Sequence, residues 1–151
     1  MLSDEEKRRN VIRCVFGGDT NRFEEFVDVL RAGIPEKTGA VLRGSAVTGE
    51  RWKDGAPFDA DGPGTSDMDI TLVGDEAIGL FTVTGFFVPG LHSRPLSDED
   101  PGIAPPLCPL RHDLMALARR PVNIQATRDI VMFFRGEILG QPYLTLIDKP
   151  E

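Results

Sequence analysis

The sequence predicts an α+β fold in which a small mixed β-sheet is backed by helices. Near the N-terminus, apolar residues recur at the spacing of amphipathic helices, and short apolar runs bounded by Gly and Pro follow. With 151 residues and 40% hydrophobic content, the chain has the size and composition of a single globular domain, 1–151. No internal repeat or low-complexity tract divides it.

Two helices are predicted at the N-terminal end. Ser3 followed by Glu6 is a capping-box pattern, and the Gly17-Gly18 pair ends this first helix. Asp19 or Thr20 can cap the second helix, which a Gly-x-Pro sequence stops. Its apolar residues fall at helical spacing, on one face that we expect to pack against the core: Phe23, Phe26, Val27 and Leu30.

The next elements are two strands that carry polar residues at their ends. The run 40–43 is predicted as a strand, and a second strand passes through Asp67, Met68, Asp69 and Ile70 to Val73. Because strand residues alternate between faces, both aspartates project together while Met68 and Ile70 point into the core. The α-carbons of the two aspartates would then lie about 6.6 Å apart, from a rise of roughly 3.3 Å per residue.

This pattern is typical of a site for a divalent cation and a phosphate. Neighbouring carboxylates repel each other unless a cation lies between them, and Mg²⁺ takes one or two carboxylates together with phosphate oxygens. Gly44 lets the backbone approach a phosphate closely, and the Ser45 hydroxyl can bond to its oxygens. Arg43, next to this turn, is the basic residue that we expect to contribute. The implied ligand is a nucleoside triphosphate.

The Gly44-Ser45 turn followed by Asp67-Met-Asp69 resembles the signature of the nucleotidyltransferase superfamily, whose fold is shared with DNA polymerase beta. The stretches 55–59 (Gly-Ala-Pro-Phe-Asp) and 65–70 (Thr-Ser-Asp-Met-Asp-Ile) are similar to a bacterial subgroup that includes polymorphic toxin domains. In that subgroup a Gly-x-Pro-Phe-Asp element lies in a lengthened loop before Asp-x-Asp.

Two interpretations of this lengthened loop stay open. In one, Arg51, Lys53 or Asp59 reaches over the triphosphate or the acceptor. In the other, the segment is a Gly- and Pro-rich surface loop pinned by Trp52 and Phe58.

The resemblance also implies a third carboxylate on a later strand, but Asn123 occupies the matching position. An asparagine cannot accept a proton there, although its carbonyl oxygen can still ligate a hard cation. Asp59, Asp61 and Asp129 are the candidate substitutes for the missing acid.

The resemblance implies a Mg²⁺- or Mn²⁺-dependent nucleotidyltransferase that moves a nucleoside monophosphate from a triphosphate, with ATP as the expected nucleotide, to a hydroxyl of a protein, RNA or small molecule. The alternative is a catalytically degenerate member that binds a nucleotide or a partner protein. The expected site consists of Asp67 and Asp69 as metal ligands and catalytic residues, Asn123 at the third catalytic position, and Arg43, Gly44, Ser45 and Ser66 against the nucleotide.

The segment 79–109 is predicted to be an irregular insertion or lid. Within it, 80–84 and 86–88 favour a strand or hairpin, while 104–109 is too rich in proline for a helix or a central strand. His92 is either a general base or an ordinary loop residue.

A helix is expected over about 110–119, followed by strands at 122–127 and 143–147. The apolar run 130–134 fits a strand or a short buried helix.

The composition and the net charge limit the classes of binding partner that we expect. A net charge of −7 argues against an extensive nucleic-acid surface. The acidic N-terminus lacks the pattern of a secretory signal and no apolar run reaches membrane-spanning length, so we expect a cytoplasmic protein without membrane contact. Cys14 and Cys108 have no metal-binding spacing and are interpreted as packing residues. A homodimer is a reasonable expectation.

Overall fold

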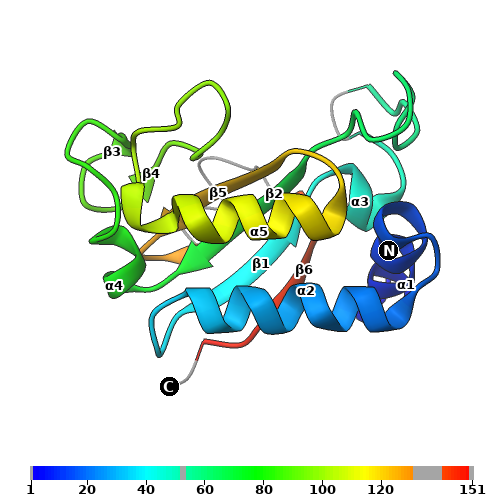
Figure 1. The fold of residues 1–151 in the computed structure, drawn as a ribbon, viewed down its shortest axis with the longest axis horizontal. Helices are drawn as coiled ribbons and strands as arrows, with labels where there is room; N and C mark the ends of the chain where they lie inside the picture. The colour runs from blue at the N-terminus through cyan, green and yellow to red at the C-terminus, as the bar shows by residue number, and fades with distance from the viewer. Residues whose placement is uncertain (1, 52–53, 131–140, 150–151) are drawn as a thin grey trace.

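The structure is a computed structural model and describes residues 2–51, 54–130 and 141–149. It contains a six-stranded mixed sheet in the order β3-β4-β5-β2-β1-β6, with α2 and α5 lying across one face (Figure 1). The predicted α+β class, a mixed sheet backed by helices, is therefore confirmed. The strands are β1 (Gly39–Arg43), β2 (Met68–Val73), β3 (Phe86–Val88), β4 (His92–Ser93), β5 (Val122–Thr127) and β6 (Tyr143–Ile147).

Both N-terminal helices form where the sequence places them. Helix α1 (Asp4–Phe16) begins at a complete capping box between Ser3 and Glu6 and ends at Gly17 in the left-handed conformation. Helix α2 (Thr20–Gly33) is capped by the Asp19 side chain, which accepts a hydrogen bond from the Arg22 N–H. Their apolar faces join the core through Val11, Phe16, Phe23, Phe26 and Leu30.

The central strands bury one apolar face against the helices and carry most of their polar side chains on the other face. β1 pairs antiparallel with β2, and β2 pairs parallel with β5. Residues that alternate along these strands and face the helices are fully buried: Ala40, Leu42, Met68, Ile70, Leu72, Val122, Ile124 and Ala126. The inward orientation predicted for Met68 and Ile70 is thus confirmed. Strand β6 adds to the free edge of β1 and confirms the strand predicted at 143–147.

The segment 79–109 contains more regular structure than its sequence suggests. The strand predicted at 80–84 is wrong, because this stretch turns after the short helix α4 (Asp75–Ile78) and the Thr82 N–H donates to Ile103 O instead of to a strand. The strand at 86–88 is confirmed as β3, which pairs with β4. Leu96, Ile103 and Leu107 of this segment are buried in the core.

The proline-rich run 104–109 was also predicted incorrectly. It forms a 3₁₀ turn, η1 (Pro105–Leu107), that leads directly into α5 (Cys108–Ala118). The prolines are accommodated because they lie at the first positions of each element, where a backbone N–H is not needed for the helical hydrogen bonds. Helix α5 therefore begins two residues before the expected position.

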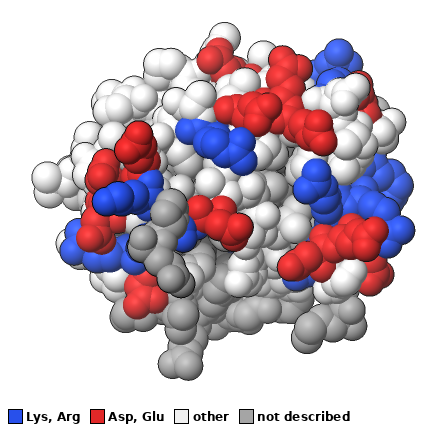
Figure 2. Space-filling model, turned by 90° about the horizontal axis from the view of Figure 1, so that it is seen from below, with Lys and Arg blue, Asp and Glu red and all other residues white. Residues whose placement is uncertain are grey.

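Several predicted features fall outside the described residues, namely most of 130–134 together with Trp52 and Lys53. Among the helices that the structure describes, none combines the length and apolar character needed to cross a bilayer. Figure 2 shows the molecule from below: among the described residues, basic and acidic side chains are interspersed over this face.

Candidate functional site

Three predicted site residues lie side by side across three neighbouring strands. In the sheet register Arg43 of β1 is opposite Asp69 of β2, and Asp69 is opposite Asn123 of β5. Directly paired residues project to the same face, so the three side chains form a row on the face opposite the helices. Asp67 precedes β2 and belongs to the same alternation as Asp69.

The Asn123 side chain connects the two aspartates. Its amide nitrogen donates to Asp67 Oδ2 and to Asp69 Oδ1, both at 3.1 Å. An ionised carboxylate can only accept hydrogen bonds, so the amide presents its NH₂ group to the pair and not its oxygen. This contact reduces the repulsion between the two carboxylates in the free protein.

The electrostatic environments of Asp67 and Asp69 differ. Burial raises the pKa of the Asp69 carboxyl above its ordinary value, and the neighbouring Asp67 charge acts in the same direction. Arg43 and the Asn123 hydrogen bond oppose this rise in pKa. Asp67, in contrast, is exposed. The site therefore combines one exposed carboxylate with a half-buried one that gains from added positive charge.

Arg43 supplies positive charge beside Asp69 without forming an ion pair within the described residues. Its Nη2 donates to Gln125 Oε1 at 2.8 Å, and its Nη1 lies 3.4 Å from Gln141 Oε1. The buried Nε has no hydrogen-bond partner in the described part of the chain. Gln125 in turn donates from Nε2 to Ser93 O at 3.2 Å. Neutral partners thus orient this guanidinium, and no salt bridge from the described residues compensates its charge.

The Gly44-Ser45 turn packs directly against the acidic pair. Gly44 has φ of 103° and ψ of −169°, a conformation that essentially only glycine adopts. A Cβ atom on Gly44 would lie 3.3 Å from Asp69 Oδ2. The short helix α3 (Ser45–Thr48) follows, and Ser45 itself is largely buried. The turn and the carboxylate are therefore adjacent, as the sequence predicts.

Ser66 contributes to the shape of the loop that leads into β2. Its Oγ accepts a hydrogen bond from the Asp59 N–H at 2.8 Å, and its own N–H donates to Asp59 Oδ1 at 3.0 Å. Ser66 is therefore adjacent to Asp67, with its hydroxyl hydrogen-bonded to the Asp59 backbone.

The three candidate substitutes for a third acid occupy other surroundings. Asp59 forms a double hydrogen bond with Arg120. Asp61 pairs with Arg51 at 3.3 Å in the same loop. Asp129 follows the end of β5 that is opposite to Asn123. In the part of the chain that the structure describes, no three His, Cys, Asp or Glu side chains are grouped for metal binding.

His92 is remote from the acidic pair. It is buried on β4, opposite Thr127, and its Nδ1 lies 2.7 Å from Thr127 Oγ1. Thr127 is at the end of β5 away from Asn123. The structure therefore does not place His92 within reach of Asp67 or Asp69.

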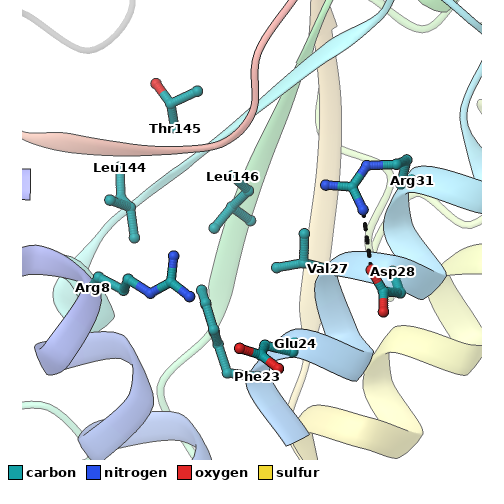
Figure 3. A pocket seen from close by; sticks show the side chains of 9 residues that line it. All are labelled: Arg8, Phe23, Glu24, Val27, Asp28, Arg31, Leu144, Thr145 and Leu146. Atoms are coloured by element: carbon teal, nitrogen blue, oxygen red, sulfur yellow. Dashed lines mark hydrogen bonds and ion pairs between the residues drawn. The ribbon is translucent and has the colours of Figure 1, made fainter. Parts of the chain in front are cut away.

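A separate pocket of about 230 Å³ lies between α1, α2 and β6, on the helical face of the sheet (Figure 3). Apolar side chains that include Phe23 and Val27 form its wall, and charged side chains that include the Arg31–Asp28 pair, 3.0 Å apart, line its rim. It contains none of the predicted site residues.

Asp67, Asp69 and Asn123 together offer oxygen ligands that suit a hard divalent cation. Asp67 and Asp69 offer carboxylate oxygens, and Asn123 offers a carbonyl oxygen if its amide turns over. Gln125 and Gln141, which orient Arg43, were not among the residues predicted from the sequence. Gln125 could have been found, because it lies two residues after Asn123 on β5 and so shares its face.

Comparison of this chain with protein-family models, with curated proteins and with solved structures found no match.

Proposed function

We propose that this protein transfers a nucleoside monophosphate from a nucleoside triphosphate to a hydroxyl group, in a site formed by Asp67, Asp69 and the Gly44-Ser45 turn. The observation that carries the proposal is the Arg43–Asp69–Asn123 row, with a positive-φ glycine packed against the Asp69 carboxylate. The antiparallel β1–β2 pair and the parallel β2–β5 pair support a polymerase beta-like arrangement of these strands.

In the proposed reaction, a hydroxyl oxygen of the acceptor attacks the α-phosphorus of the triphosphate. A new P–O bond forms, the bond from the α-phosphorus to the bridging oxygen breaks, and pyrophosphate leaves with the displaced electron pair while the proton of the acceptor hydroxyl passes to solvent water. A bound Mg²⁺ or Mn²⁺ would supply positive charge against the phosphate oxygens. Asp67 and Asp69 would hold this ion, and the turn at Gly44 would bring backbone N–H groups close to the phosphates.

Arg43 would add a fixed positive charge on the Asp69 side of the site. Its guanidinium is already oriented by Gln125 and Gln141, so little ordering would be needed when an anionic phosphate approaches. Its location beside the turn supports a role in binding the triphosphate.

One observation favours the alternative, a member that binds a nucleotide or a partner protein without turnover. Asn123 donates to both carboxylates, and none of the candidate acids in the described residues takes the place of a third carboxylate. Without that carboxylate, neither a second cation nor a proton acceptor is provided at this position.

The decisive first experiment is thermal unfolding with each of the four ribonucleoside triphosphates, with Mg²⁺ or with chelator. Ligand at about 100 times its Kd should add about 2.7 kcal/mol, which corresponds to several degrees in Tm. We expect a metal-dependent shift in the wild type and none in Asp67→Asn. Asp61→Asn, a charge removal at an exposed carboxylate in the preceding loop, is the matched control and should keep the full shift.

Turnover is then tested by pyrophosphate release in the presence of candidate acceptors. Release that depends on Asp67 supports the transferase. A metal-dependent nucleotide shift without release supports the degenerate alternative. The absence of any shift with all four nucleotides contradicts both nucleotide-based proposals.

A further inference from the structure

Asp67, the outer carboxylate of the proposed site, lies just before β2, so the strand ladder does not fix its position. Two contacts hold the residues on either side of it. Ser66 O accepts a hydrogen bond from Arg120 Nη1 at 3.0 Å, and the Met68 N–H donates to Pro121 O at 3.0 Å. The backbone on either side of Asp67 is therefore held by two consecutive residues, Arg120 and Pro121.

Arg120 is itself rigidly held. Its Nη1 and Nη2 donate to Asp59 Oδ1 and Oδ2 at 2.8 and 3.2 Å, and its guanidinium lies 4.4 Å from the centre of the Phe58 ring. The side chain is only 6% exposed. A bidentate carboxylate and a stacked aromatic ring together fix both the position and the plane of a guanidinium.

Asp59 is fixed by the loop in which it lies. Its two carboxylate oxygens also accept hydrogen bonds from the Ser66 N–H at 3.0 Å and the Gly64 N–H at 3.1 Å. Its backbone has a φ of 58°, an uncommon conformation for a residue with a side chain, which these contacts maintain. The Asp59 carboxylate thus joins the loop, the start of β2 and the residue before Pro121.

We propose that Asp59 and Arg120 are positioning residues that set the separation between the Asp67 carboxylate and the Asn123 amide. Arg120 and Pro121 lead directly into β5, which carries Asn123 as its second residue. The segment that holds the backbone around Asp67 is therefore the segment that places Asn123. The Asp59–Arg120 pair connects the loop before Asp67 to the residues before Asn123. The Asn123 amide nitrogen lies 3.1 Å from Asp67 Oδ2.

The Gly-x-Pro-Phe-Asp element thereby has a structural role, which the resemblance alone leaves open. Phe58 stacks on Arg120 and Asp59 pairs with it, so this part of the loop holds Arg120 in place and, through Arg120, the backbone next to Asp67. The importance of the arrangement for chemistry rests on the proposed function, but the geometric claim can be tested without any nucleotide.

The test compares Asp59→Asn and Arg120→Lys with the wild type. The first readout is the side-chain amide signal of Asn123 in ¹⁵N–¹H spectra of the free protein, assigned by its loss in Asn123→Ser. We expect this signal to shift and to exchange faster with solvent in Asp59→Asn, because Asp67 is no longer held against the amide. Arg120→Lys keeps the charge but loses the bidentate geometry, and should give an intermediate shift.

The second readout is Mn²⁺ binding to the free protein, followed by electron paramagnetic resonance. Loss of a residue that orients a metal ligand should weaken binding about tenfold in Asp59→Asn. The matched control is Asp61→Asn, which breaks an Asp–Arg pair in the same loop that is exposed to solvent, with Asp61 72% exposed. This control should leave both readouts unchanged.

The inference is overturned if Asp59→Asn leaves the Asn123 amide signal unchanged while the protein is folded. Far-ultraviolet circular dichroism equal to that of the wild type shows that the variant is folded. If Asp59→Asn does not fold, Arg120→Lys decides in the same way. If the wild type binds neither Mn²⁺ nor nucleotide, the proposed function fails while the amide signal still decides the geometric claim.

Discussion

Asp69 and Asn123 are direct cross-strand partners on β2 and β5, and the Asn123 amide nitrogen lies 3.1 Å from the Asp69 carboxylate. The resemblance to nucleotidyltransferases leads one to expect a carboxylate at position 123. A neutral donor there stabilises the acidic pair without a cation, whereas a third acid would increase its repulsion. On the proposed function, the residue at position 123 would therefore set how strongly the free site favours binding of a divalent ion.

Asn123→Asp is expected to make the protein less stable without metal and more responsive to metal. A third carboxylate opposite Asp69 adds like-charge repulsion, which should lower the free energy of unfolding by about 1 kcal/mol. The added charge should also tighten Mn²⁺ binding about tenfold. Unfolding followed with and without Mn²⁺ measures both effects. An Mn²⁺ affinity equal to that of the wild type would show that position 123 is not part of a cation site.

Asp69→Asn is expected to raise stability at neutral pH while abolishing metal-dependent nucleotide binding. Burial raises the pKa of Asp69 in the folded protein, so its ionised form opposes folding. This penalty is fully present above the folded pKa and disappears as the pH falls below the ordinary value of 3.8. Urea unfolding at pH 7 and at pH 3.5 should show the variant more stable at pH 7, with a smaller difference at pH 3.5. A variant less stable than the wild type at pH 7 contradicts this account.

Asp59 should make the protein sensitive to acid. Burial alone would raise the pKa of this carboxyl, but hydrogen bonds from Arg120, Ser66 and Gly64 outweigh it and lower the pKa to about 2. The corresponding stabilisation is complete above the ordinary value of 3.8 and is lost as the pH falls toward about 2. After allowance for solvent screening it is on the order of 1–2 kcal/mol.

The measurement for Asp59 is thermal unfolding of the wild type and of Asp59→Asn between pH 6 and pH 2. The two Tm curves should be well separated above pH 4 and should converge near pH 2. Parallel curves over the whole range would mean that another group dominates the acid sensitivity.

Local patterns were sufficient to predict the elements that carry the site. Apolar and polar residues alternate along β2 from Met68 to Leu72, so the orientation of Met68 and Ile70 followed from the period of two alone. β1 is instead a short, almost entirely apolar run that is followed by Gly44. Gly44 and Asp69 are close because β1 and β2 are antiparallel neighbours.

The contacts that complete the site depend on long-range packing and were not predictable. Asp59 and Arg120 are 61 residues apart in sequence, and nothing in either local pattern indicates that they pair. The pairing of Arg43 with Gln141 spans 98 residues. The turn at 80–84 was mistaken for a strand because its Leu, Phe and Val fit strand propensity, whereas a tertiary hydrogen bond to Ile103 determines its conformation.

Gly44→Ala should disturb both stability and ligand binding. The alanine would have to adopt a φ of 103°, and its Cβ would lie 3.3 Å from Asp69 Oδ2. The backbone strain should cost on the order of 1–3 kcal/mol. Gly17→Ala is the matched control, since Gly17 also has positive φ, at 61°, but a Cβ there meets nothing within 4 Å. Thermal unfolding should show a loss in both variants, with nucleotide binding impaired in Gly44→Ala alone; impaired binding in Gly17→Ala as well would indicate a general effect of destabilisation.

Arg43→Met should separate the charge of Arg43 from its packing. Methionine can fill much of the space of the side chain but leaves Gln125 Oε1 without its 2.8 Å donor, which should cost about 1–3 kcal/mol. Because Arg43 lowers the pKa of Asp69, its removal should raise that pKa further. We therefore expect metal-dependent nucleotide binding to weaken about tenfold at neutral pH, because the fixed positive charge beside Asp69 is lost. Arg43→Lys keeps a positive charge and should retain more affinity than Arg43→Met. Equal affinities in the two variants, measured by isothermal titration calorimetry, would show that Arg43 acts only by holding Gln125 and Gln141 in place and contributes no charge to ligand binding.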